Sequence, residues 1–587
     1  MADNSTPKIV ANNGGRLDMP ATPEKEYQSD VLVAGTGFAG VFAALEARRN
    51  GLSVVMVDKG ALGWSGMSPW ASDARPFDPT IYDRDEWHRN LGFSTEWLYD
   101  RRWMDIYFDE SLDIFHTLHK WGTHDCKPFE RAKVFRKLLK AASVRVVERT
   151  MLTSLLQDDS GAVAGAVGFK FDDERNECSA IAFRSRAVIL CTGAGGYKAP
   201  GFPAWGQTFD GDAMAYAVGA TITGKEFHDT HNTFSTNPAD CYQKWEWVQS
   251  EVGNRIWPGP PESMGLSLDL RLVLLAHNGI ARPWSPTSPA GSPPPPNLDN
   301  SKYLNTGFLD TPGIHPQVGI TAPPFKITKE MGHPIGGATV GMGVHKGEGV
   351  FNSDYSCRAD GVTGLYAAGD ALGSMMCGPV YPAPGFSHYG SAIQGRRAAR
   401  FASEFVKAQA TPPLVSNAVV TTAIKAIWAP FAQTQGFDPG WVTEVLRSTM
   451  SPFQVLYIKS PRRLDGALAS IEYMRSHVVP KMIAENGHQL RLAHEAANML
   501  LNAEMKLRAG LYRTESRGTH FREDYPARDD RNWRCFVLIK NEGGRMVFSK
   551  HPLPLEWAPP AELPYRQKYP RVFPGEDQYL QDHPQSA

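Results

Sequence analysis

The sequence lacks the features that would assign it to several common protein classes. Its seven cysteines form no Cys-x-x-Cys pair, so we predict neither a zinc site nor an iron–sulfur cluster, and no metal site of another kind. Lysine and arginine number 61 against 62 aspartates and glutamates, a balance that gives no general attraction to nucleic acid or to an anionic membrane. No apolar run of about 18 residues occurs, so we expect a soluble protein without direct membrane insertion. The scattered cysteines favour a reducing compartment, the cytoplasm.

A glycine-rich turn near the start of the chain is the strongest motif, in SDVLVAGTGFAGVFAALEARRNGLSVVMVDKG. An apolar run meets Gly35-x-Gly37-x-x-Gly40, a helical pattern follows, and a second apolar run ends at Asp58. The glycines permit a tight turn, close approach of the backbone to a pyrophosphate and close packing of helix on strand. The helix N-terminus would face the phosphates, and the Asp58 carboxylate could accept hydrogen bonds from ribose hydroxyls. The unit predicts a dinucleotide site, to which we also assign Phe38, Ala39, Lys59 and Ser65.

Two later strand ends indicate which dinucleotide is bound. SRAVILCTGAGGY runs into Thr192 and Gly193, and DGVTGLYAAGDALGS ends on Gly369 and Asp370. In flavoproteins of the two-dinucleotide-binding type, both elements return to the first sheet, and the second directs an acid at the flavin ribitol. Three such elements in this order predict FAD rather than NAD, with Ser387 as a further contact.

The segment RTESRGTHFREDYPARDDRNW, which ends at Trp533 after a helical pattern, resembles the C-terminal region of the succinate dehydrogenase and fumarate reductase flavoprotein family. That family also includes L-aspartate oxidase and the adenylylsulfate reductase flavoprotein. The resemblance extends from about Ser29 to Trp533 and is weakest in the middle of the chain. Taken on its own, the alternation of arginine and acid predicts a network of exposed ion pairs that holds the helices to the flavin domain. Direct contact of this segment with substrate or flavin is the alternative.

The resemblance implies an α/β fold: a Rossmann-like FAD domain with an inserted α+β cap and a C-terminal helical bundle. The proline-rich stretch RPWSPTSPAGSPPPPNLDN cannot continue a strand or helix, which indicates a loop within the cap. We expect a flexible leader at 1–28, the FAD domain at 29–240 and 334–412, the cap at 241–333, the helical domain at 413–535 and an irregular tail at 536–587.

The family chemistry implied by the resemblance is hydride transfer between flavin and a substrate carbon, while a positioned group moves a proton on the neighbouring carbon. EFHDTHNTF resembles the family stretch whose histidine contacts the substrate, which implies a role for His231. His345 lies near the position of a second such histidine, and Arg282 is a weak substitute for the family's proton-delivering arginine. His388 and Tyr389 are further candidates, with the alternative that each of these residues is structural.

Two departures from the family pattern bear on how FAD is attached and on which substrates are expected. Gly66 lies about where covalently flavinylated members have a histidine, so FAD is expected to bind non-covalently. The arginine that clamps a substrate carboxylate should follow Asp370 closely, yet the next arginine is Arg396, expected on the following helix. The intervening loop has neutral and aromatic groups, suited to a carbonyl or phenolic oxygen and a flat apolar body.

We therefore predict an FAD-dependent oxidoreductase that acts on a carbon–carbon or carbon–oxygen bond adjacent to a carbonyl in an organic, non-dicarboxylate substrate. The redox direction stays open, and so does the electron partner, either dioxygen or a separate electron-transfer protein or subunit. One alternative is the flavoprotein subunit of a sulfur-nucleotide reductase of the adenylylsulfate type. The other is a flavin-binding module without catalytic activity. We predict no nucleic-acid partner.

Overall fold

The computed structural model describes residues 9–10, 20–66, 68, 76–124, 128–172, 177–198, 206–227, 232–235, 314–315, 319–320, 333–336, 348–376, 378–379, 386–450, 453–456, 458–570 and 572–584. Most of the expected cap at 241–333 lies outside these ranges. Within it, the short strands β10 (Ile314–His315) and β11 (Gly319–Ile320) pair with each other, and at its borders β9 (Asn232–Ser235) pairs with β12 (His333–Gly336).

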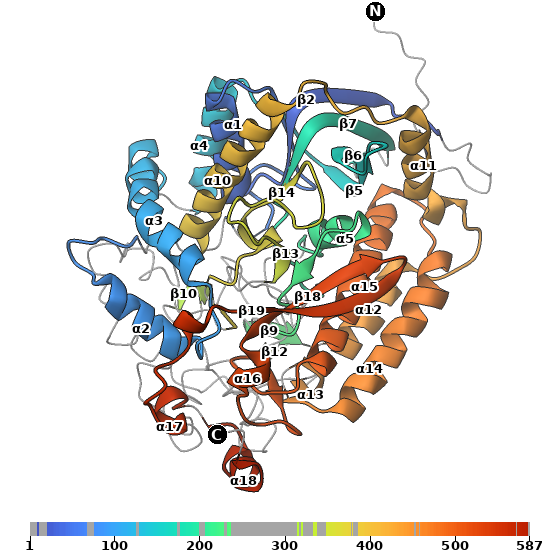
Figure 1. Ribbon diagram of the computed structural model, residues 1–587. Coiled ribbons are helices and arrows are strands. Elements are labelled where there is room, and N and C mark those ends of the chain that lie inside the picture. The colour runs from blue at the N-terminus through green and yellow to red at the C-terminus, as the bar shows by residue number, and fades with distance from the viewer. Residues whose placement is uncertain are drawn as a thin grey trace, which may run out of the picture.

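An eight-stranded sheet forms the centre of the FAD domain (Figure 1). Its main path runs β4 (Arg145–Val147), β3 (Val54–Val57), β2 (Lys25–Ala34), β7 (Glu177–Leu190), β6 (Val163–Asp172) and β5 (Thr150–Gln157), with β14 (Leu365–Ala367) and β1 (Ile9–Val10) also paired to β7. β2 pairs in parallel with β3 and β7, and β14 pairs in parallel with β7. The two later strand ends thus return to the sheet of the first motif, as the sequence predicts.

Continuous apolar runs explain why these strands form the interior of the sheet. Val31 to Ala34 and Val54 to Val57 are buried residue by residue, the pattern of parallel strands covered on both faces. One cover consists of α1 (Phe38–Arg49) with α10 (Phe386–Ala408) packed along it. The two helices approach so closely that a Cβ on Gly395 would lie 2.1 Å from the Ala39 carbonyl oxygen. Glycine is therefore required at this crossing.

Further helices flank the FAD domain or form the C-terminal helical domain. In Figure 1, the blue helices of the N-terminal half lie away from the orange helices α12, α14 and α15, which pack on one another around a core of their own. The helices are α2 (Arg84–Ser94), α3 (Arg101–Trp121), α4 (Pro128–Ala141), α5 (Asp210–Ala217), α11 (Asn417–Ile427), α12 (Pro439–Met450), α13 (Phe453–Leu456), α14 (Pro461–Tyr473), α15 (Gly487–Tyr512), α16 (Asp530–Trp533), α17 (Tyr565–Lys568) and α18 (Glu576–Asp582).

The C-terminal tail is not irregular, which corrects the expectation for 536–587. β18 (Cys535–Glu542) and β19 (Arg545–Pro552) form a hairpin whose turn, Gly543-Gly544, has positive φ at both residues. The hairpin extends a five-stranded sheet in the order β15 (Leu372–Gly373), β13 (Gly349–Phe351), β8 (Ile222–Thr223), β18, β19. The Gly543-Gly544 pair is a hairpin signal in the sequence, but the prolines farther along the tail favoured the prediction of an irregular segment. At the other end of the chain, β2 begins at Lys25, inside the expected leader.

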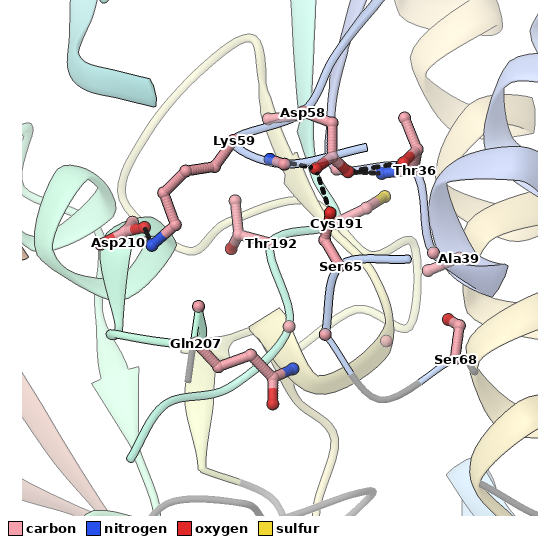
Figure 2. Close-up of a pocket in the computed structure, with 18 of the residues that line it drawn as sticks. Thr36, Ala39, Asp58, Lys59, Ser65, Ser68, Cys191, Thr192, Gln207 and Asp210 are labelled. Atoms are coloured by element: carbon pink, nitrogen blue, oxygen red, sulfur yellow. Dashed lines mark hydrogen bonds and ion pairs between the residues drawn. The ribbon is translucent and has the colours of Figure 1, made fainter. Parts of the chain in front are cut away.

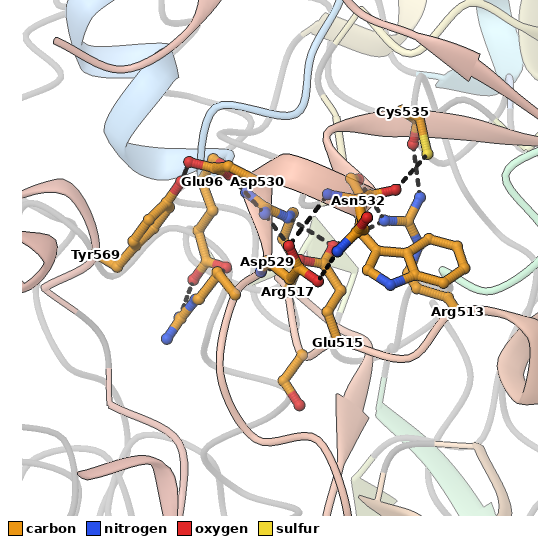
Figure 3. Close-up of polar contacts among 12 residues, drawn as sticks. Glu96, Arg513, Glu515, Arg517, Asp529, Asp530, Asn532, Cys535 and Tyr569 are labelled. Atoms are coloured by element: carbon orange, nitrogen blue, oxygen red, sulfur yellow. Dashed lines mark hydrogen bonds and ion pairs between the residues drawn. The ribbon is translucent and has the colours of Figure 1, made fainter. Parts of the chain in front are cut away.

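The charged segment near the C-terminus forms an ion-pair network, as predicted, but its central pairs are buried rather than exposed (Figure 3). It includes the paired strands β16 (Ile458–Lys459) and β17 (Phe521–Arg522). The Arg517 guanidinium contacts the Glu515 carboxylate at 2.8 Å, and both side chains are 0% exposed. Arg528 contacts Glu576 at 2.8 Å and also pairs with Glu96, which precedes α3 in the sequence. The network therefore joins the N-terminal half of the molecule to its last helix.

Removing one partner from this network leaves an uncompensated charge in the interior. We expect Arg528→Met to lower the free energy of unfolding by about 3–5 kcal/mol, because the buried Glu96 loses the Arg528 cation without gaining water, while Glu576 keeps its pair with Arg566. Urea denaturation followed by circular dichroism measures this change.

Arg358→Met is the matched control, since the Arg358–Asp354 pair is exposed, and it should cost less than about 1 kcal/mol. If both variants lost the same free energy of unfolding, the buried network would contribute no more to stability than an exposed pair does.

Candidate functional site

A cavity of about 360 Å³ opens where the parallel strands end. Its lining comes from the chain just after β2, β3, β7 and β14, at the carboxyl ends of neighbouring strands. This is the edge at which open α/β sheets bind ligands. The cavity volume lies within the range of about 300–1,000 Å³ typical of small-molecule sites. Figure 2 shows side chains from these separate segments facing the same space.

The glycine-rich turn is shaped by a close backbone crossing. Gly35 has φ +110°, and a Cβ there would lie 2.1 Å from the carbonyl oxygen of Cys191, the first residue after β7. A Cβ on Gly40 would in turn lie 2.0 Å from the carbonyl oxygen of Gly35. Gly37, the N-cap of α1, provides no side-chain cap. The start of α1 therefore faces the cavity with only backbone at its N-cap, the arrangement that suits a phosphate.

Asp58 organises the loop after β3. One carboxylate oxygen accepts hydrogen bonds from the Thr36 backbone N–H at 2.8 Å and from its hydroxyl at 2.5 Å. The other accepts from the Gly60 N–H at 2.7 Å and from the Ser65 hydroxyl at 2.5 Å. Figure 2 shows Asp58 between Thr36 and Ser65. The carboxylate thus ties both cavity-lining loops together, and ribose binding by it stays a prediction.

Lys59 reaches across the cavity wall toward the C-terminal half of the chain. Its ammonium contacts Asp210 at 2.7 Å and Glu495 at 2.8 Å, and it donates to the Thr208 hydroxyl at 2.8 Å. Burial alone would lower the pKa of Lys59, but the two carboxylates outweigh it and raise that pKa. Lys59 therefore stays protonated at neutral pH and fixes the wall.

Polar atoms that face the cavity remain available for a ligand. Among the described residues, the Thr192 hydroxyl and the Gln207 side-chain oxygen are buried without a hydrogen-bond partner, and both residues line the cavity. An unpartnered buried polar atom is costly, and a polar ligand relieves that cost. A glycine turn at a helix N-terminus, an acid after β3 and free polar atoms after β7 together fit an elongated phosphate-containing cofactor such as FAD.

His388 lies at the other side of α1, in the first turn of α10. Its ring stacks on Phe38 with centroids 3.9 Å apart and planes inclined by 11°. Both residues line the cavity together with Gly369 and Asp370, the strand end assigned to the ribitol. The stack fixes the orientation of the imidazole by packing.

The structure brings most of the predicted cofactor residues together. Those that line the cavity are Gly35, Gly37, Phe38, Ala39, Asp58, Lys59, Ser65, Thr192, Gly193, Gly369 and Asp370. Gly40 packs behind the turn, and Ser387 belongs to α10 without a described side chain. Of the catalytic candidates, His388 lines the cavity, and Tyr389 is buried outside the lining. His231, Arg282 and His345 lie outside the described residues.

Some cavity residues escaped the sequence reasoning. Gln207 and Asp210 come from the segment that begins α5, where an acid beside glycine at a helix start was a usable signal. Arg491 comes from α15, and nothing near it in the sequence marks a ligand site.

Family models match two separate parts of the chain, one near each end. The FAD binding domain model matches residues 30–133, and the fumarate reductase flavoprotein C-term model matches residues 455–565. A fumarate reductase (CoM/CoB) subunit from Methanothermobacter marburgensis is 24% identical over 572 residues, which cover 88% of this chain and 98% of that protein. The chain is thus similar, at low identity, to members of the succinate dehydrogenase and fumarate reductase flavoprotein family. It is an FAD-dependent oxidoreductase.

Solved structures with low sequence identity share the whole fold. Mycobacterium smegmatis Sdh1 in complex with UQ1 superposes with a TM-score of 0.70 at 22% identity, over 93% of this chain and 98% of that one. Adenylylsulfate reductase from Archaeoglobus fulgidus gives 0.69 at 19% identity, over 93% of this chain and 99% of that one.

Two features are absent from the described ranges. No helix there is both long and apolar enough to cross a membrane. In the same part of the chain, no group of three or more histidine, cysteine, aspartate or glutamate side chains is arranged to hold a metal ion.

The crossing at Gly35 yields a direct test of the cofactor site. We expect Gly35→Ala to be purified with little or no FAD, because the new methyl group would displace the Cys191 carbonyl that shapes the turn. Visible flavin absorbance per protein measures the loss.

Gly51→Ala is the control for backbone strain alone. Gly51 also has a positive φ, +86°, but a Cβ there would meet nothing within 4 Å. This variant should lose about 1–2 kcal/mol of stability and keep its FAD. A Gly35→Ala protein with a full complement of flavin would contradict the assignment of the turn.

Proposed function

We propose that this FAD-dependent enzyme oxidises or reduces a bond adjacent to a carbonyl in an organic substrate that is not a C4 dicarboxylate. The observation that carries the proposal is the place of Arg396, the first arginine after Asp370. It lies in α10 and pairs with Asp113 of α3 at 2.6 Å, and it is not among the residues that line the cavity.

The absence of that arginine matters because carboxylate recognition depends on geometry. A guanidinium binds a carboxylate through two parallel hydrogen bonds, which no neutral side chain reproduces. The segment between Asp370 and Arg396 supplies His388 at the cavity instead. An imidazole on an aromatic partner suits a carbonyl or phenolic oxygen on a flat apolar body.

Bound FAD supplies the hydride acceptor or donor. The part left to the protein is to orient the substrate and to hold or move one proton. We assign His388 to that work, because its stack on Phe38 holds the ring in a fixed orientation at the cavity. His231, His345 and Arg282 in the cap region and Tyr389 beside His388 stay as further proposed participants.

Three accompanying proposals concern the cofactor, its electron partner and its location. FAD binds non-covalently, since Gly66 lines the cavity and has no side chain to form a link. Electrons pass to or from either dioxygen or a separate electron-transfer protein. The enzyme works in the cytoplasm, as the cysteine pattern indicates.

An anaerobic absorbance titration tests the proposed substrate class. The oxidised holoenzyme is titrated with ketones, enones, phenolic acids, succinate and sulfite with AMP. Dithionite-reduced enzyme, freed of excess reductant, is then offered the enones, fumarate and adenylylsulfate. Bleaching by a ketone or phenol, or reoxidation by an enone, supports the proposal. Turnover of succinate or fumarate contradicts it, turnover of the sulfur compounds supports a sulfur-nucleotide reductase, and no reaction at all supports a flavin-binding module.

The role of His388 gives a sharper prediction. His388→Phe keeps a ring on Phe38 but removes both nitrogens, so FAD content should be unchanged while substrate-driven flavin reduction slows by about 100-fold or more. Stopped-flow absorbance measures the rate.

His551→Gln, on β19 away from the cavity, should reduce at the wild-type rate and serves as the control. A wild-type rate in flavin-loaded His388→Phe would exclude a catalytic role for this residue.

A further inference from the structure

The helical domain contributes to the cavity through a single described side chain. Among the described residues that line the cavity, Arg491 alone comes from the chain beyond α10. It lies in the second turn of α15, a helix that packs against α5 and β6 of the FAD domain. Nothing in the local sequence or in the family motifs described above assigns it a role.

The guanidinium of Arg491 is fixed on two sides and open on a third. It contacts the Glu495 carboxylate at 3.1 Å and the His488 ring nitrogen at 3.1 Å. Its Cζ lies 5.6 Å from the centre of the Phe171 ring. Its Nε is buried and has no hydrogen-bond partner among the described residues. One donor edge is thus preorganised at the cavity, without an acceptor in the part of the chain that the structure describes.

Backbone contacts show at which end of the cavity this edge lies. Phe171 N–H donates to the Arg149 carbonyl, Arg149 N–H donates to the Gly60 carbonyl, and Thr150 N–H donates to the Asp58 carbonyl. Arg491 therefore lies beside the loop after β3 and the start of β5. Gly369 and His388 lie across the start of α1, packed on Ala39 and Phe38. The second strand end is assigned to the ribitol, so Arg491 belongs to the adenosine end.

The surroundings of Arg491 favour an electron-rich ligand. Glu495 is fully buried and contacts Lys59 at 2.8 Å, Lys198 at 2.7 Å and Arg491 at 3.1 Å. Burial alone would raise the pKa of Glu495, but these cations lower it to about 2, so the carboxylate is ionised at neutral pH. With Asp210 as the second acid, three cationic side chains share two carboxylates. This cluster of five side chains therefore carries a net positive charge.

We propose that Arg491 binds the adenosine half of FAD, so that the helical domain forms part of the cofactor site. Its free edge donates to an acceptor on the adenosine, or its plane lies on the adenine face, both ordinary modes for arginine. Glu495 is the positioning residue, since it holds Arg491 and Lys59 at once. Binding of FAD and docking of α15 against the FAD domain are thereby coupled.

The test compares FAD with its adenosine half alone, in the full-length holoenzyme. Dilution followed by free-flavin fluorescence gives the FAD dissociation constant, and displacement of FAD by added ADP gives the inhibition constant for ADP. Arg491→Ala should raise both constants by about tenfold, corresponding to the loss of one charge-assisted contact. Arg508→Ala, which removes another arginine with glutamate partners from the same helix, should change neither.

Two results would overturn the proposal. Unchanged FAD affinity in Arg491→Ala would show that the side chain makes no contact that matters. Weaker FAD binding with an unchanged ADP constant would place the contact on the flavin half. Arg491→Gln, which keeps the length and a donor for Glu495, serves if the alanine variant does not fold, and the same two outcomes apply to it.

Discussion

The structure depends on one close backbone crossing, between Gly35 after β2 and Cys191 after β7. Two strands that are far apart in the sequence end side by side there, and a Cβ on Gly35 would lie 2.1 Å from the Cys191 carbonyl oxygen. Because the crossing is so tight, the start of α1 faces the ends of β7 and β14 across one cavity. The loop after β3 joins it through Asp58, which bonds both Thr36 and Ser65. The cavity is thus a property of this crossing and not of any single loop.

Buried charges hold the remaining parts of the chain around that centre. Lys59 joins the loop after β3 to α5 and α15, and Arg513 contacts Glu226 at 2.9 Å with both side chains 0% exposed. Arg528 and Glu96 connect the last part of the chain to the segment between α2 and α3. Buried ion pairs often add little net stability compared with apolar packing, but they tolerate only matched partners. Here they specify which surfaces of the FAD and helical domains meet.

The sequence predicted the local motifs and the strand ends well. The alternation of apolar runs and glycine turns around Gly35 and Gly193 is governed by backbone sterics, which act within a few residues. Other features were hidden because their partners are distant. Asp58 was assigned to ribose from its position after β3, while the structure shows four hydrogen bonds to Thr36, Gly60 and Ser65. The arginines near the C-terminus were predicted to form exposed pairs because sequence spacing does not report burial.

By itself, the sequence determined the fold class, the dinucleotide type and the absence of an arginine between Asp370 and Arg396. Glycine placement, strand periodicity and residue identity carry that information directly. Only the tertiary structure decided that the tail forms the β18–β19 hairpin, that Arg396 pairs with Asp113, and that Arg491 lines the cavity. Those facts depend on which side chains meet across hundreds of residues. Packing between distant segments determines these contacts, and no local sequence pattern predicts such packing.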